Sequence, residues 1–117
     1  MIEPASNADE SGAMAMLDPM VMDVVPTEGQ TITVPATDRK EIFLNLAPAG
    51  DLQMLTVIMP KGYPGQRCFV GSTKGVWTCH MTADGMTVNN ADIMLSPGDN
   101  AAYVCNRNLT WSRVLTS

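Results

Sequence analysis

The stretch LSPGDNAAYVCNRNLTWSRV, residues 95–114, decides the fold class of this chain. Its Tyr, Val, Thr and Trp residues favour strands, and two groups of turn-forming residues divide them. Pro97-Gly98 is typical of a tight turn, and Asn106 to Asn108 are typical of a second, polar turn. The stretch therefore predicts the order strand, tight turn, strand, polar turn, strand, which indicates an all-β protein.

The chain before this stretch repeats the pattern of short apolar segments separated by turns. Thr31–Val34 and Glu41–Leu46 alternate apolar and polar residues, which predicts two half-buried strands. The residues predicted to face the core in these strands are Ile32, Val34, Ile42, Leu44 and Leu46. Gln53–Met59 is apolar at neighbouring positions, as expected for a central strand covered on both faces. About eight or nine strands at intervals of roughly ten residues predict an antiparallel β-sandwich, a jelly-roll-like domain or a barrel-like domain.

Two of the later segments are predicted to pair as a hairpin. If residues 73–74 form a two-residue loop, Val70 lies opposite Trp77 and Cys68 lies opposite Cys79. These four side chains would then share one face of the sheet.

The composition limits the classes of protein to which the chain can belong. A length of 117 residues is enough for one apolar core, so we expect a single domain. The net charge of -5 argues against a nucleic-acid partner, because binding to phosphates needs clustered positive charge. No apolar run approaches the roughly 20 residues that span a bilayer, which predicts no membrane segment. The first residues lack the basic head of a secretory signal, and three irregularly spaced cysteines favour a reducing compartment, so we expect synthesis in the cytoplasm.

A zinc site or a thiol nucleophile would have to use Cys68, Cys79, His80 and Cys105. Structural zinc favours paired ligands a few residues apart on a turn, whereas these cysteines lie inside predicted strands. Cys79 and His80 are neighbours in a strand and therefore point to opposite faces, which separates a nucleophile from its base. We expect buried free thiols, no metal and no cofactor. An enzyme would need Cys79 or Cys105 beside a base.

The aromatic residues are the candidates for ligand binding, because sugars stack on exposed aromatic faces. Tyr63, Trp77 and Trp111 are the residues that would form such a ligand or interface surface. Trp111 lies in the predicted terminal strand, where a role in the core or in sealing an edge explains it better.

Residues 1–22 differ in composition from the rest and are expected to form an extended N-terminal arm, followed by a β domain of residues 23–117. The first twelve residues are small, polar and acidic, and AMAMLDPMVM, residues 13–22, is a methionine-rich apolar segment suited to lie across a neighbour's sheet. Ordering such a terminus costs about 1–2 kcal/mol per residue, so an ordered arm needs a partner surface. The arm residues expected to bind that partner are Met14, Met16, Leu17, Met20 and Met22. The alternative is that this methionine segment adds a strand to the chain's own core.

Several segments together give the chain a family resemblance. They are Leu44-Asn45-Leu46 before a turn, residues 53–60, Gly65-Gln66, residues 95–99 leading into residues 101–105, and residues 111–114. In this pattern, residues 31 to 114 resemble the small β-sandwich domains of tailed-bacteriophage virion proteins, especially head decoration or cement proteins and some tail-fibre tips. The resemblance implies a non-enzymatic homotrimer that docks on the major capsid protein or other virion subunits and stabilises the capsid surface. The alternative that it implies is a receptor-binding or glycan-binding tail-fibre tip.

Overall fold

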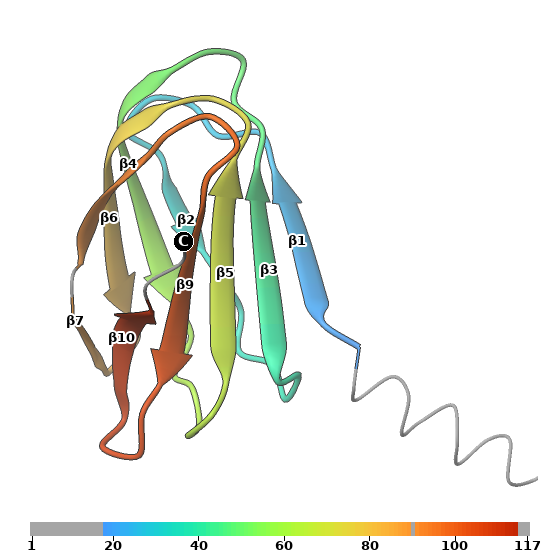
Figure 1. The fold of residues 1–117 in the computed structure, drawn as a ribbon, viewed down its shortest axis with the longest axis vertical. Coiled ribbons are helices and arrows are strands. Elements are labelled where there is room, and N and C mark those ends of the chain that lie inside the picture. Colours follow the sequence, from blue (N-terminus) through green and yellow to red (C-terminus); the bar gives the residue numbers. More distant parts are fainter. Residues whose placement is uncertain (1–17, 90, 115–117) are drawn as a thin grey trace, which may run out of the picture.

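The computed structural model describes residues 18–89 and 91–114, which form an all-β fold without a helix (Figure 1). Sheet A contains, in spatial order, β1 (Met20–Val24), β3 (Glu41–Leu46), β5 (Arg67–Ser72), β9 (Asn100–Cys105), β10 (Thr110–Val114) and β7 (Thr87–Asn89). Sheet B contains β2 (Thr31–Thr33), β4 (Leu52–Met59), β6 (Val76–Ala83) and β8 (Asp92–Leu95). The prediction of an all-β protein is confirmed.

The chain changes sheet after every strand from β1 to β9 (Figure 1). Within each sheet, strands two positions apart in the sequence therefore become neighbours, and β1–β3–β5 and β2–β4–β6 pair in parallel. Antiparallel pairing joins β5 to β9, β9 to β10 and β6 to β8. This winding is β-solenoid-like, so the prediction of an antiparallel sandwich, jelly roll or barrel is wrong. The alternation of apolar residues specifies which side of a strand is buried, but it is the same for a strand in either sheet.

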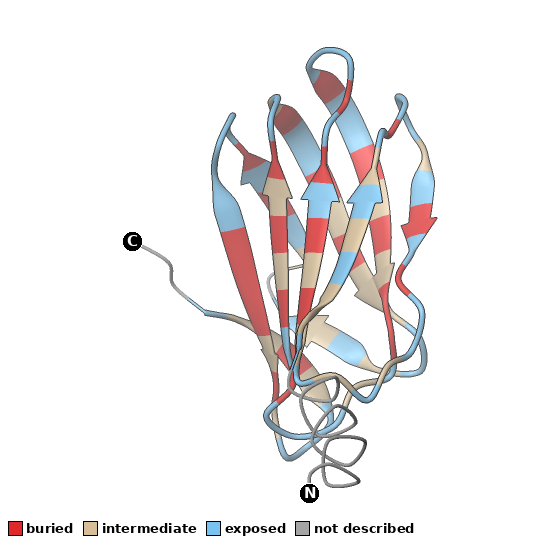
Figure 2. Cartoon of the chain, turned by 90° about the vertical axis from the view of Figure 1, so that its right-hand side faces the viewer, coloured by how far each residue is buried: buried red, intermediate tan, exposed pale blue. Residues whose placement is uncertain are grey.

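The core lies between the inner faces of the two sheets. Figure 2 shows buried and exposed residues alternating along the strands, which is the period expected when one face of each sheet is covered. The five residues predicted to face the core are buried in this way: Ile32, Val34, Ile42, Leu44 and Leu46. That part of the prediction is confirmed.

The central strand β4 is covered on one face only. Leu55, Val57 and Met59 are fully buried, whereas Gln53 is exposed and Met54 is 48% exposed. The prediction that both faces of this strand are covered is therefore wrong, because sheet A packs against one side of sheet B and the described residues place no layer on the other.

An irregularity in β4 and β6 turns a tryptophan outward. Consecutive inward residues are three apart in both strands, Leu52 and Leu55 in β4 and Val76 and Cys79 in β6, and they lie in register with each other. On the other side of β6, the register with β8 shifts between Val76 and Cys79, as at a β-bulge. Two consecutive residues of β6 consequently face solvent, and one of them, Trp77, is 60% exposed.

The predicted hairpin between β5 and β6 does not form, because the two strands belong to different sheets. Cys68 lies opposite Ile42 of β3, and Cys79 lies opposite Leu55 of β4. Both thiols are buried, but Trp77 points outward and does not share their face. The short connection between β5 and β6 therefore crosses from one layer to the other.

The closing stretch has the predicted order of strands and turns. In the first turn the Asp99 amide donates to the Ser96 carbonyl at 2.9 Å, and Gly98 adopts φ 84°, a conformation suited to glycine. This turn carries the chain from β8 in sheet B to β9 in sheet A. In the second turn the Leu109 amide donates to the Asn106 carbonyl at 2.9 Å, and β9 and β10 form an antiparallel hairpin.

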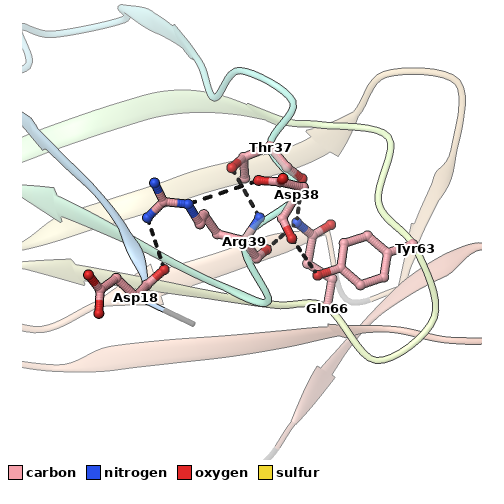
Figure 3. A network of polar contacts seen from close by, with 6 residues as sticks. All are labelled: Asp18, Thr37, Asp38, Arg39, Tyr63 and Gln66. Carbon is pink, nitrogen blue, oxygen red and sulfur yellow. Dashed lines mark hydrogen bonds and ion pairs between the residues drawn. The ribbon is translucent and has the colours of Figure 1, made fainter. Parts of the chain in front are cut away.

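A buried glutamine joins two loops at one end of the domain (Figure 3). Gln66 is fully buried, and its side-chain amide donates to the carbonyls of Thr37 at 3.1 Å and Arg39 at 2.8 Å. Nearby, the Tyr63 hydroxyl donates to the carbonyl of Asp38 at 3.0 Å. These bonds satisfy loop carbonyls and fix residues 37–39 against the loop that precedes β5.

Candidate functional site

The residues expected to form the partner-binding arm fall into two groups. Met20 and Met22 lie in β1, where they are partly buried and pack against the core of their own chain. Met14, Met16 and Leu17 lie outside the described residues. The β domain therefore begins with β1, before residue 23, and includes the last part of the predicted arm.

The described chain begins at an edge of sheet A. β1 pairs with β3 on one side only, so its other side presents backbone groups that no described strand pairs with. Just before β1, Arg39 Nη1 donates to the Asp18 carbonyl at 3.1 Å, which holds the entry to this strand (Figure 3).

The three predicted interface aromatics have different environments. Trp111 is fully buried, and its indole N–H donates to the Pro60 carbonyl at 3.0 Å. Tyr63 is 39% exposed, but its hydroxyl is held by the Asp38 carbonyl. Trp77 has the largest exposed fraction of the three, so it is the one that presents an aromatic surface to solvent.

The three cysteines are buried free thiols, as the sequence predicts. Burial raises the pKa of the Cys68 thiol to about 12. Burial, with a smaller contribution from the negative charge of Asp92, raises the pKa of the Cys79 thiol to about 12, and burial also raises the pKa of Cys105. A thiol in such surroundings stays protonated at neutral pH and is a poor nucleophile and a poor metal ligand.

His80 points away from these thiols, on the outer face of sheet B. Its Nδ1 lies 2.5 Å from Asp92 Oδ1 of the neighbouring strand β8, and both side chains are well exposed. Residues 18–89 and 91–114 contain no group of three His, Cys, Asp or Glu side chains placed to hold a metal ion. His80 and Asp92 therefore form a polar contact on the exposed surface of sheet B.

A line of apolar side chains crosses the outer face of sheet A. The strand register aligns five residues, one from each of β1, β3, β5, β9 and β10, which we call the apolar row: Val21, Phe43, Phe69, Ala102 and Val114. The rings of Phe43 and Phe69 stack with centroids 5.0 Å apart. The two ends of the row are open, since Val21 is 56% exposed and Val114 is 38% exposed.

Polar residues border the apolar row on both sides. Glu41 and Arg67 lie opposite each other on one side. On the other side, Asn45 Nδ2 donates to Asp23 Oδ1 at 3.0 Å, and Asn45 also lines a hollow of about 260 Å³. An apolar centre with a polar margin is the usual arrangement of a protein interaction surface.

Sequence reasoning missed the apolar row. Phe43 stands between Ile42 and Leu44, which are both buried. The sequence around Phe43 therefore does not indicate that its ring belongs to an interaction surface. The row exists because strands far apart in the chain are aligned side by side, and only the sheet register provides that information.

A second candidate surface surrounds Trp77. A partly open hollow of about 250 Å³ lies between the start of β6 and the end of β8, and Trp77 and Met94 line it with Asp51, Gly75 and Ser96. Met94 is 57% exposed. Most of the lining is apolar, with one carboxylate and one hydroxyl side chain.

Comparisons of the chain with family models, with curated proteins and with solved structures return no match. In the part of the chain that the structure describes, no helix has the length and apolar character needed to cross a membrane.

Proposed function

We propose that this chain is a non-enzymatic structural protein of a virion, a decoration or cement protein of the capsid. In this proposal it forms a homo-oligomer, as a trimer, docks on the major capsid protein or other virion subunits and stabilises the head. It is made in the host cytoplasm and is located on the capsid surface. The apolar row of sheet A is the observation that supports the proposal best.

The apolar row has the properties of a docking surface. It places two stacked phenylalanines and two exposed valines in one line on the face of a sheet, with polar residues on both margins. Burying apolar area contributes about 25 cal/mol per Å² removed from water. Val21 and Val114 are exposed, Phe43 and Phe69 are half-buried, and Ala102 between Phe69 and Val114 is buried. Apolar side chains gathered at a protein surface often mark an interaction site.

The position of the N-terminal segment adds to this argument. Residues 1–17 precede β1 in the sequence, and β1 is the edge strand that also contributes Val21 to the apolar row. Met14, Met16 and Leu17 belong to this segment and supply apolar groups for a partner surface. In the proposal, the apolar row and this segment bind neighbouring subunits together.

The first test removes the open ends of the apolar row. The double variant Val21→Asp, Val114→Asp places charge at both ends, where the exposed positions tolerate substitution, and we expect it to be monomeric while the unchanged full chain self-associates. Val25→Asp is the matched control, because Val25 is 70% exposed and lies outside the row. Sedimentation velocity gives the mass of each protein, and circular dichroism checks that each is folded.

Two outcomes would contradict the assembly proposal: a full chain that stays monomeric, or a double variant that associates like Val25→Asp. Deletion of residues 1–17 should weaken association while β1 stays intact.

For the virion assignment, the full chain is coexpressed with the major capsid protein of the same genome, and cosedimentation with the assembled shells is measured. A chain that remains in the supernatant while shells form argues against a cement protein.

A receptor-binding or glycan-binding tail-fibre tip is the second candidate, and the exposure of Trp77 beside Met94 favours it. Sugar rings stack on exposed indole faces. In this case the chain should bind particular glycans on an array, and Trp77→Ala should abolish that binding while the oligomeric state stays the same.

A further inference from the structure

Trp77 faces solvent at the bulge of β6, where the regular alternation of the strand is interrupted. Regular alternation would direct only one residue outward between Val76 and Cys79, whereas the bulge directs two and places the Trp77 ring at the corner of sheet B. An indole that is 60% exposed contributes little to the core. Bulges frequently re-aim a side chain at a binding site.

A carboxylate lies at the same corner. Asp51 Oδ1 accepts a hydrogen bond from the Gly75 amide at 2.9 Å, which fixes the carboxylate beside the first residues of β6. An added Cβ at Gly75 would lie 3.4 Å from that oxygen, so the carboxylate is in close contact with the first residues of β6. Lys74 precedes Gly75, yet no lysine or arginine of the described residues forms an ion pair with Asp51.

The walls of this hollow determine the class of ligand. Trp77 and Met94 offer an aromatic face and a polarizable thioether, and Asp51 supplies one negative charge. A volume of about 250 Å³ is smaller than most pockets for whole small molecules, but it accommodates one long side chain. A sugar ring would need several converging polar groups, whereas here Asp51 and Ser96 are the polar side chains of a mostly apolar lining.

The geometry points to a binding site for an arginine side chain of a protein partner, with its guanidinium stacked on Trp77 and paired with Asp51. A guanidinium suits both contacts, because it is planar, always charged, weakly hydrated and able to pair with a carboxylate. The net charge of -5 also attracts a basic segment. This site goes beyond the assembly proposal and does not depend on it, since it lies on sheet B and the apolar row lies on sheet A.

The experiment titrates the full chain with three probes: arginine amide, its neutral analogue citrulline amide, and methyl glucoside. Binding is followed by the NMR signals of the Trp77 indole N–H and the Gly75 amide, with the buried Trp111 indole as internal reference. We expect arginine amide alone to shift the first two signals, in a saturable manner that weakens as salt is added. Trp77→Ala and Asp51→Asn should each weaken binding by about tenfold.

The controls separate this site from the other proposals. Asp51→Asn retains an oxygen that can accept from Gly75, and Asp84→Asn makes the same charge change at an exposed turn away from the hollow. Equal shifts with citrulline amide, equal weakening by Asp84→Asn, or no saturable shift with any probe would each overturn the arginine site. Binding of methyl glucoside alone would also overturn it and support the glycan-binding candidate. None of these results changes the mass measured for the apolar-row variants.

Discussion

The outer faces of the two sheets differ although their inner faces share one core. On sheet A, one outward residue from each of five strands contributes to the apolar row. On sheet B, many of the outward residues are threonines, namely Thr31, Thr33, Thr56, Thr78 and Thr82. The exposed apolar residues of sheet B include Trp77 and Met94, which lie together at one corner.

The difference shows how one pattern of burial supports two kinds of surface. Every strand needs apolar residues on its inner side. The residues on its outer side depend on whether solvent or another protein contacts that face. Threonine favours a strand through its branched side chain and still leaves a polar face. A preference for strand structure in water does not explain an outer face with aligned phenylalanines. We therefore propose association for sheet A and side-chain recognition for the corner of sheet B.

The two tryptophans give the comparison with the largest expected effect. Trp111 is fully buried on the inner side of sheet A, so Trp111→Ala should lower the free energy of unfolding by about 3–5 kcal/mol. Trp77 is mostly exposed on sheet B, so Trp77→Ala should change the free energy of unfolding by about 0.5 kcal/mol or less. Urea unfolding measures both values.

If Trp111→Ala does not fold, Trp111→Phe retains a ring, loses the hydrogen bond to Pro60 and should still be destabilised more than Trp77→Ala. Similar losses for the two tryptophan positions would mean that Trp77 is covered, and the assignment of the two faces would be wrong.

The sequence predicts the buried side of many strands, because alternation is a local property. It identifies Ile32, Ile42 and Leu44 as core residues, and the turns at Pro97-Gly98 and residues 106–108 lie where their residue types indicate. It does not predict which sheet a strand joins. Strands of either sheet show the same alternation of apolar and polar residues. The alternation therefore does not distinguish a hairpin within one sheet from a connection that crosses to the other sheet.

The candidate surfaces were harder to predict than the core. The bulge that exposes Trp77 depends on the register between β4, β6 and β8, which is a property of three strands together. The apolar row depends on the alignment of five strands. Trp77 was a candidate because of its residue type alone, and Phe43 and Phe69 were not candidates because their neighbours in sequence are the buried residues of the same strands.

The buried thiols of the two sheets should lower the free energy of unfolding at alkaline pH in the same way. Burial raises the pKa of Cys68 in sheet A and Cys79 in sheet B from 9.0 to about 12, and it raises that of Tyr103 from 10.0 to about 12. Above pH 9 the thiols of the unfolded chain ionise while the folded ones stay protonated, so the unfolded state binds fewer protons. The free energy of unfolding should therefore fall by about 1.4 kcal/mol per pH unit for each thiol, up to about pH 12.

Urea unfolding between about pH 8 and about pH 10.5, a range that includes the ordinary pKa of a thiol, measures this slope. Cys68→Ala removes one of the buried thiols, so its slope should be smaller than that of the unchanged chain, and Cys79→Ala should reduce it by a similar amount. A slope that neither variant changes would show that other groups cause the alkaline loss of stability.

Double-mutant cycles on the two outer faces give the smallest expected effects and separate the faces by the kind of interaction. On sheet A, the stacked rings of Phe43 and Phe69 should have a coupling energy of about 0.5–1.5 kcal/mol, measured with Phe43→Leu, Phe69→Leu and the double variant. This coupling comes from apolar contact, so it should be the same in low and high salt.

On sheet B, the matched cycle uses His80→Gln, Asp92→Asn and the double variant. Exposed ion pairs contribute about 0.2–1 kcal/mol, so the coupling between these two side chains should be small even though their atoms lie 2.5 Å apart. It should decrease as salt is added, because salt screens exposed charges, and it requires the protonated form of His80.

A salt-sensitive coupling on sheet A, or a salt-insensitive one on sheet B, would mean that the chemistry of the two faces is not divided as the structure indicates. An apolar face that keeps its coupling in salt is suited to a permanent interface, whereas a face governed by screened charges is suited to a partner that binds and leaves.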